Sequence, residues 1–320
     1  MKIYSSKIYD LLLALYIVYL RNNPDMVDEF DYIERPNIEY VNKIITEFSK
    51  YDCNELFKYI SCFNEISIPI NIAIGLTENY EIDQNIMKVD YINSNMNYGS
   101  LNDFVLLLKE FALKVDWNKI YNKNRFIYNE LINEFDKIDY SKFLTEINNF
   151  YGNESKSYNF IISIFMNGGF GIKDNQGNLY YIKGFKYNMD KFEYDMPFII
   201  ECMFHEFSHP SVNPLIDKYY ELFSIDKIYQ EAIDNGFPKC YQDKKIFLYE
   251  YFVRANANVL VNKFYPNTKI EDWIINYGFI HLQDLSDYIY NHYKKYDKFE
   301  HLFINELIDY FNNMNDHLIK

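Results

Sequence analysis

The sequence predicts a mainly helical α+β protein, and two observations predict this fold class. Apolar residues recur at three- and four-residue spacings through most of the 320-residue chain, as they do on the buried face of an amphipathic helix. Of the ten glycines, five lie between residues 168 and 184, in the region where apolar runs are bounded by turn residues. We therefore expect a mainly helical region over residues 1–157, followed by a region over 158–320 that combines a small β-sheet with further helices.

The first predicted helix covers residues 8–20, a segment that is almost wholly apolar. Asp10 interrupts it, no small-residue cleavage site follows, and the segment is too short to span a bilayer. We therefore interpret it as a buried helix and not as a signal peptide or a membrane span. Ser100 or Asn102 can cap a helix over residues 100–115. Helical spacing also occupies residues 38–51, 54–63 and 124–138.

Residues 66–74 break the helical pattern. Isoleucine occupies every second position of this segment, and strict alternation favours a β-strand. Pro69 has no N–H to donate to a β-ladder, so we expect this strand at a sheet edge or as an extended loop. Further strands are expected over residues 157–185, where apolar runs flank a glycine-rich bend and the turn sequence DNQGN. After Pro197 the spacing is helical again almost to the end of the chain.

The composition argues against several classes of function. The formal net charge is −14 and no run of lysine and arginine offsets it, so binding to nucleic acid is not expected. The four cysteines form no CxxC pair and no dense framework, which favours reduced thiols over a disulfide scaffold. Together with the absence of a signal peptide pattern, this favours a cytoplasmic protein. The sequence predicts no membrane span and gives no oligomeric state.

Two of the six histidines form the motif HEFSH, which predicts a metal site. On a helix, His205 and His209 lie on one face, one turn apart, so that both can bind one metal ion. Glu206 follows the first histidine, where it can take a proton from a metal-bound water without binding the metal itself. Pro197 suits the first turn of this helix. The residues therefore favour a zinc hydrolase, with one Zn²⁺ ion as its cofactor.

Pro210 directly follows the second histidine and predicts the end of the helix. Proline disfavours helical geometry at the residue before it and cannot donate the next helical hydrogen bond. We therefore expect the helix to stop at His209, with the chain bending back over residues 211–214. That bend would bring Asn213 near the metal.

A catalytic zinc site needs three protein ligands, and the sequence leaves the third one open. The motif continues without the glycine and third histidine of a metzincin site, because Val212 and Leu215 occupy those positions. The candidates that remain are carboxylates. Glu221, Glu231 and Glu250 lie downstream of the motif.

Glu250 stands out because it lies on a strongly apolar predicted helix together with Arg254. These two residues are four apart, so they share a face, and Ala255 and Ala257 would let the helix approach a neighbour closely. They form either a metal ligand with a supporting arginine or a plain ion pair within the helix. The histidines at 281, 292, 301 and 317 show no metal-site spacing, and we expect them to be surface or packing residues.

A non-catalytic site is the alternative that the sequence leaves open. Cys202 lies three residues before His205 and could face the same metal, which would suit a structural site with four protein ligands. That arrangement leaves Glu206 without a role and offers no obvious fourth ligand. The alternatives to a peptidase are therefore a binding or scaffold protein with structural zinc or none, and a zinc hydrolase that acts on another bond.

The motifs also carry a resemblance to a known family. An HExxH helix followed by a downstream glutamate is the gluzincin pattern of thermolysin-like zinc metallopeptidases. More closely, HEFSHPSVNPLIDKYY followed by YEYFVRA resembles a bacterial family of gluzincin-like metallopeptidases that share a HEFSH helix, then Asn-Pro, then a Glu-x-x-x-Arg-Ala helix. The resemblance is specific over residues 160–264 and faint before them. It implies a zincin-like (gluzincin) catalytic domain.

Matched residue by residue, the resemblance implies roles for individual side chains. It implies His205, His209 and Glu250 as zinc ligands and Glu206 as the general base. It also raises Asn213 and Arg254 as groups that support the ligands or contact the substrate, with Arg254 a candidate stabiliser of the oxyanion. In such enzymes a strand beside the cleft pairs with a peptide substrate, which places Asn167, Gly168 and Gly169 as substrate-binding residues.

Two departures from the family pattern qualify these expectations. Pro210 stands where the family usually carries serine. The separation between His209 and Glu250 is longer than in thermolysin-like enzymes, which keeps Glu231 as the alternative third ligand.

Overall fold

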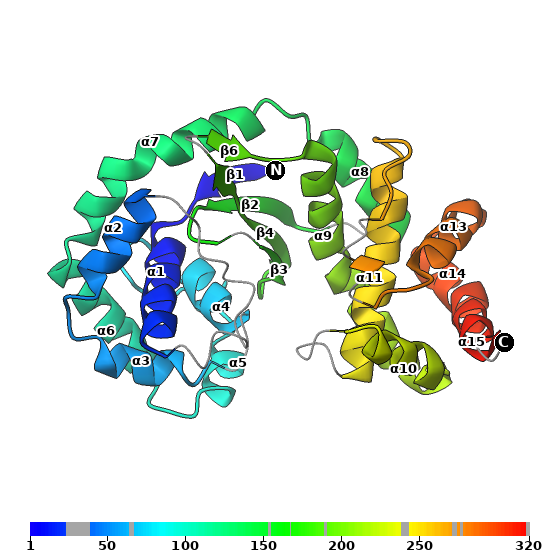
Figure 1. Ribbon diagram of the computed structural model, residues 1–320, viewed down its shortest axis with the longest axis horizontal. Coiled ribbons are helices and arrows are strands. Elements are labelled where there is room, and N and C mark those ends of the chain that lie inside the picture. The colour runs from blue at the N-terminus through cyan, green and yellow to red at the C-terminus, as the bar shows by residue number, and fades with distance from the viewer. Residues whose placement is uncertain are drawn as a thin grey trace. The chain divides into compact units, whose positions relative to one another are not determined.

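A computed structural model of the chain describes residues 1–23, 39–63, 67–152, 155–166, 168–188, 191–237, 243–270, 274–275 and 278–317. Most of these residues lie in helices, and short strands form a small mixed sheet (Figure 1), which confirms the α+β class. The chain folds into two compact units. The first combines Met1–Asp139 with Ser155–Tyr194, and the second combines Tyr140–Glu154 with Asp195–Lys320. The strands within residues 155–194 thus belong to the same unit as the N-terminal helices, whereas the helices after residue 195 belong to the other unit.

The first unit is built around a four-stranded sheet. Its strand order is β1-β2-β4-β3, in which β1, β2 and β4 run parallel and β3 runs antiparallel to β4. The N-terminal strand β1 was not predicted, because its pairing with β2 joins segments about 150 residues apart and leaves no local pattern. The bounds are β1 (Lys2–Ser5), β2 (Ser157–Ser163), β3 (Gly169–Lys173), β4 (Asn178–Gly184), and a separate pair β5 (Lys186–Asn188) and β6 (Lys191–Glu193).

The helices of the first unit confirm most of the predicted ones. Helix α1 is buried from Ile8 to Leu20, as expected for the apolar N-terminal segment. Ser100 caps α6, since its hydroxyl accepts a hydrogen bond from the backbone N–H of Asp103. The bounds are α1 (Lys7–Asn22), α2 (Glu39–Phe48), α3 (Asn54–Ile60), α4 (Ser67–Gly75), α5 (Val89–Ser94), α6 (Leu101–Lys114) and α7 (Trp117–Phe135).

The strand predicted over residues 66–74 is wrong, because Ser67–Gly75 forms helix α4. Isoleucine alternation indicates a strand only when one face is exposed, whereas almost every residue of α4 is buried. Pro69 lies in the first turn of the helix, where its missing N–H has no helical partner to lose. Buried Asn71 donates its side-chain N–H to the Ser67 carbonyl at 2.9 Å, while its side-chain oxygen accepts no hydrogen bond from the described residues.

Asp10 is a fully buried carboxyl group on α1. The hydroxyls of Tyr128 and Ser163 both donate to it, the latter at 2.8 Å. Burial raises the pKa of Asp10 to about 7, while the two hydrogen bonds act in the opposite direction. Because the folded state holds a proton that the unfolded chain releases near the ordinary aspartate pKa, Asp10 lowers stability progressively as the pH rises from about 4 to 7.

Replacing Asp10 with asparagine is therefore expected to flatten the dependence of stability on pH. Asparagine has the same shape and can still accept from Tyr128, but it carries no buried charge above pH 7. The variant should gain up to about 4 kcal/mol relative to the parent between pH 4 and pH 8. Urea unfolding midpoints of both proteins at pH 5 and pH 8 measure this. A parent-to-variant difference that stays constant with pH would contradict the assignment.

The second unit is entirely helical within its described residues. Helices α9 and α11 pack along each other and carry the candidate site (Figure 1). Aromatic rings fill the core around them, including Phe143 against Phe204 on α9 and Phe303 against Phe252 on α11. The bounds are α8 (Ser141–Tyr151), α9 (Met196–Tyr219), η2 (Tyr220–Leu222), α10 (Asp226–Asp234), α11 (Lys244–Asn262), α13 (Leu282–His292), η4 (Tyr293–Lys295), α14 (Phe299–Leu302), the π-helix η5 (Phe303–Leu307) and α15 (Ile308–His317).

The predicted helix end at Pro210 is wrong, because α9 continues through Pro210 and Pro214 to Tyr219. Each proline removes one helical hydrogen bond, at a cost of roughly 3 kcal/mol in a helix interior. Packing offsets this cost, since Val212 and Ile216 continue the buried face beyond the first proline. Pro197 lies in the first turn of α9, as predicted.

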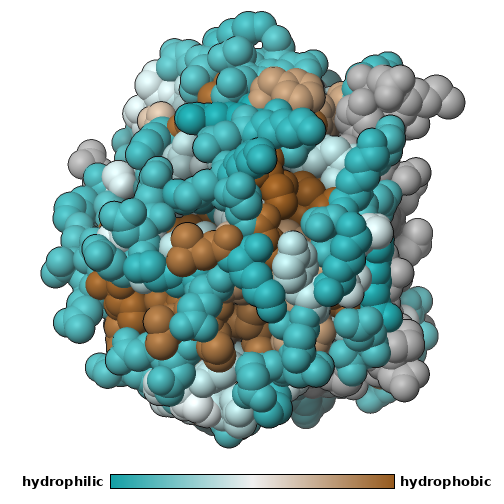
Figure 2. Space-filling view, turned by 90° about the vertical axis from the view of Figure 1, so that its left-hand side faces the viewer, coloured by the Kyte–Doolittle hydropathy of each residue, from teal (hydrophilic) through white to brown (hydrophobic). Residues whose placement is uncertain are grey.

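The face of the protein that Figure 2 shows is largely polar. Figure 2 shows hydrophilic residues over most of one face, with hydrophobic residues in separate patches between them. Among the residues that the structure describes, no helix has both the length and the apolar character needed to cross a membrane.

Candidate metal centre

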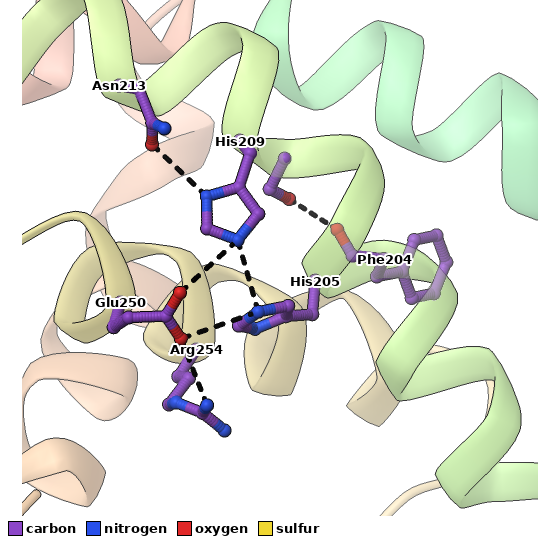
Figure 3. Close-up of polar contacts among 7 residues, drawn as sticks. Phe204, His205, His209, Asn213, Glu250 and Arg254 are labelled. Carbon is purple, nitrogen blue, oxygen red and sulfur yellow. Dashed lines mark hydrogen bonds and ion pairs between the residues drawn. The ribbon is translucent and has the colours of Figure 1, made fainter. Parts of the chain in front are cut away.

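Two histidines from α9 and one glutamate from α11 converge on a single point (Figure 3). The Nε2 atoms of His205 and His209 lie 3.2 Å apart. The carboxylate of Glu250 meets both of them, with Oε2 at 3.6 Å from Nε2 of His205 and Oε1 at 3.5 Å from Nε2 of His209. The HEFSH spacing thus places both rings as predicted, and α11 supplies the carboxylate from across the helix pair.

These separations match those of ligands around one tetrahedral metal ion. Zinc binds imidazole nitrogen and carboxylate oxygen at about 2.0–2.2 Å, which puts neighbouring ligand atoms of a tetrahedron roughly 3.3 Å apart. The three observed separations of 3.2, 3.5 and 3.6 Å lie close to that value. The separations join four atoms, because Glu250 meets His205 with Oε2 and His209 with Oε1. If Glu250 binds through one oxygen, the three residues leave a fourth tetrahedral position open.

Asn213 fixes the tautomer of His209. Its side-chain oxygen lies 3.2 Å from Nδ1 of the ring (Figure 3), and a carbonyl oxygen can only accept, so Nδ1 carries the proton. Nε2 of His209 is then left with its lone pair, directed at His205 and Glu250. This is the ring state that binds a metal, and the partner on Nδ1 orients the ring.

His205 is held in the neutral form. Burial lowers its pKa well below the usual value, and the positive charges of Arg254 and of a protonated His209 act in the same direction. Nε2 of His205, Nε2 of His209 and the carboxylate of Glu250 share one small volume. A cation between them would be attracted to all three groups, so the arrangement suits a metal ion.

Arg254 supports the carboxylate from the other side. Its Nη2 donates to Oε2 of Glu250 at 2.9 Å, one turn along α11. Its guanidinium also lies over the ring of Phe279, 4.9 Å from the ring centre. The predicted ion pair and the predicted approach of Glu250 to the histidines are thus both present. Because Arg254 binds Glu250, its geometry fits a residue that orients a ligand, and its predicted contact with an oxyanion stays a prediction.

Glu206 is a second carboxylate at the same centre. One of its oxygens and one ring nitrogen from each histidine all lie within 4.8 Å of one another, so this trio could also hold a metal ion. Glu250 is not part of that trio, although each of its oxygens lies within 3.6 Å of a different Nε2 atom, and it stays the predicted ligand. Glu206 is then left beside the centre, where the motif predicts a general base.

The other predicted ligands lie elsewhere. Glu231, on α10, faces Nε2 of His281 at 3.8 Å and not the histidine pair, and Glu221 is exposed on η2. Among the described residues, Cys202 is not part of the cluster that could hold a metal ion. His292 and His301 each pair with a carboxylate of their own, as expected for packing and surface residues. The side chain of His317 lies outside the described part of the chain, as does Cys240.

The proposed substrate edge lies in the first unit. Asn167 is outside the described residues, Gly168 accepts a backbone hydrogen bond from Gly184, and Gly169 begins the edge strand β3. A side chain at Gly169 would meet the ring of Tyr181 at 3.2 Å, so packing within the sheet already explains this glycine. Substrate pairing along β3 stays a prediction.

Phe279, whose ring contacts Arg254, is a residue near the centre that the sequence analysis did not identify. It lies 25 residues beyond Arg254, in a short connection before α13, and no local pattern links the two. Its neighbour Gly278 has a φ of 92° and packs against the backbone of Ala232, where a side chain would clash at 2.7 Å. Because Gly278 has no side chain, the connection before α13 can pack closely against the backbone of α10 at Ala232.

The fold and the site define a mainly helical α+β protein with a two-histidine, one-carboxylate centre held between two packed helices. The chain belongs to the family described as Domain of unknown function (DUF4932), whose pattern matches residues 19–309. The match covers both units and every residue of the centre. No curated protein and no solved structure matches the chain.

Proposed function

We propose that this protein is a zinc-dependent peptidase with a gluzincin-like site. The observation that carries the proposal is the convergence of His205, His209 and Glu250 at separations that suit one tetrahedral ion. Two imidazoles and one carboxylate are a ligand set that catalytic zinc sites use, and the three ligands leave a position for water. The HExxH sequence adds a carboxylate that has no role in a closed structural site.

The residues divide the chemistry between them. A zinc ion in this centre would make a water molecule more acidic and polarise the scissile carbonyl group. Glu206 accepts the proton of the attacking water and delivers it to the leaving amine. Asn213 holds His209 in the metal-binding tautomer, and Arg254 holds Glu250 toward the histidines. Peptides or proteins are the proposed substrates.

The alternative of a non-catalytic scaffold with structural zinc predicts a fourth protein ligand. Among the described residues, Cys202 is not part of the metal-binding cluster, so Glu206 is the remaining candidate for a fourth ligand. We favour an open site, because the HExxH motif gives Glu206 the role of general base and not of ligand.

Metal analysis together with peptide digestion tests the proposal. Protein purified without chelators should contain about one zinc ion per chain and should cleave members of a random peptide library. A strong chelator should remove both the metal and the activity, and added zinc should restore them. Protein that contains no zinc and gains none on incubation with it would refute the metal assignment. A protein that binds zinc and cleaves no peptide would leave the scaffold alternative.

Replacing Asn213 with alanine is expected to weaken zinc binding by about 10- to 100-fold, because His209 loses the partner that fixes its tautomer and ring orientation. Competition with a fluorescent chelator measures the change. Asn235→Ala is the matched control, since Asn235 is exposed and bonds only a carbonyl at the end of α10. Equal zinc affinities for the two variants would show that Asn213 has no part in the centre.

A further inference from the structure

A cavity in the second unit lies beside the C-terminal half of α11. It has a volume of about 620 Å³ and is bounded by α11, the connection after it and α13. The polar groups that matter for recognition come from all three parts. They belong to Asn258, Asn262, Thr268, Gln283, Asp287 and Tyr290. We call this the α11/α13 pocket. Asn258 is eight residues beyond Glu250, or roughly 12 Å along the helix axis, so the pocket is separate from the metal centre.

The hydrogen bonds within the wall leave the pocket rich in acceptors. The side-chain nitrogens of Asn258 and Asn262 donate to the carbonyl of Thr268, at 3.4 and 2.8 Å. The side-chain nitrogen of Gln283 donates to Oδ1 of Asp287 at 2.8 Å. Within the described residues, the amide oxygens of these three side chains and Oδ2 of Asp287 accept no hydrogen bond. Asn258, Asn262 and Gln283 thus each direct a side-chain N–H into the wall and keep the oxygen for a ligand. The lining also offers donors on Asn267, Lys269 and Tyr290.

The remaining lining groups favour a ligand with positive charge. The hydroxyl of Ser286 donates to the Leu282 carbonyl at 2.9 Å, so it too directs its proton into the protein. Tyr290 contributes a half-exposed ring, and aromatic faces attract cations. Among the described lining residues, Lys269 is the one cation and Asp287 the one anion, and both side chains are exposed to solvent. The net charge of −14 adds a long-range attraction for cations.

We propose that the α11/α13 pocket binds an organic ligand that carries a protonated amine. An ammonium group offers three donors and no acceptor, which complements amide oxygens and a carboxylate. Asp287 forms the ion pair with the amine, the amide oxygens of Asn258 and Asn262 accept its other hydrogens, and Tyr290 covers the chain of the ligand. The ligand is either a free polyamine or a lysine side chain of a peptide, and both present the same group.

Titration calorimetry on the full chain tests this without any requirement for catalysis. Spermidine represents the free amine, a lysine-containing hexapeptide represents the peptide, and sorbitol is a neutral polyol of comparable size. Saturable binding of spermidine or of the peptide, without binding of sorbitol, is the expected result, and the stronger of the two identifies the source. No saturable heat for either amine up to about 10 mM would overturn the proposal, as would equal binding of sorbitol.

Two variants on the same helix locate the binding. Asp287→Asn should weaken amine binding by about threefold or more, because the ion pair with the amine is lost at a solvent-exposed residue that lines the pocket. Asp284→Asn removes the same charge from α13 at an exposed position outside the pocket and should leave the affinity unchanged. Equal losses in the two variants would mean that the amine responds only to the overall negative charge, which would overturn the assignment.

Discussion

A chain in which glutamine replaces Glu206 is expected to keep its metal and to lose peptide hydrolysis by about 10²- to 10⁴-fold, the usual contribution of a general base. Glutamine has nearly the same shape and cannot accept the proton of water. The proposed ligands His205, His209 and Glu250 are unchanged, so zinc content and thermal stability should stay near those of the parent. The kcat for a cleaved peptide, measured beside zinc content, separates the two effects.

The control for this experiment is Glu221→Gln, which makes the same chemical change at an exposed residue on η2, outside the centre. Its kcat should equal that of the parent. If Glu206→Gln cleaves peptides as fast as the parent, Glu206 is not the base, and the peptidase mechanism fails even where zinc is bound. If the variant instead loses its zinc, Glu206 is a ligand, as its place in the metal-binding cluster would also allow.

The sequence could predict the part of the site that lies on one helix. The positions of His205, Glu206 and His209 follow from helical spacing alone, because residues four apart meet on one face. Asn213 is four residues beyond His209, so a continuous α9 places it against the ring. The sequence predicts a bend at Pro210 that would bring Asn213 near the metal. In the structure Asn213 contacts His209 because α9 continues through Pro210, so the expected bend is wrong.

The parts that the sequence could not predict depend on contacts between distant segments. Strand β1 forms because it pairs with β2, and nothing in either segment's sequence indicates that the two are partners. Isoleucine alternates along α4 as it would along a strand. Because almost every residue of α4 is buried, this alternation does not distinguish a strand from a helix. Phe279 reaches Arg254 through packing of a connection against α11. In each case the local structure depends on packing against another element, and the local sequence pattern gives no information about that packing.

The position of Glu250 could be predicted only in part from the sequence. Its pairing with Arg254 follows from spacing on α11, whereas its approach to the histidines depends on how α9 and α11 pack. Sequence reasoning kept Glu231 open because the chain between His209 and Glu250 is long. The structure places Glu231 against His281 instead. The geometry therefore makes an experiment on these two glutamates decisive for the third ligand.

Removal of the Glu250 side chain is expected to have the largest effect on metal binding. Glu250→Ala should lower zinc affinity by at least about 100-fold, more than loss of a residue that only orients a ligand. It should also destabilise the apo-protein by about 3–5 kcal/mol, because Arg254 keeps its charge in a mostly buried place without its carboxylate. Zinc affinity by chelator competition and urea unfolding of the metal-free proteins measure the two effects.

Glu250→Gln separates metal binding from folding. The glutamine oxygen can still accept from Arg254, so most of the stability should return, while the weaker neutral ligand should leave zinc affinity well below that of the parent. Glu231→Ala is the competing test and should change neither quantity by much. If Glu231→Ala loses zinc and Glu250→Gln keeps it, the third ligand is Glu231, and the convergence of α9 and α11 at Glu250 is an ion-pair arrangement alone.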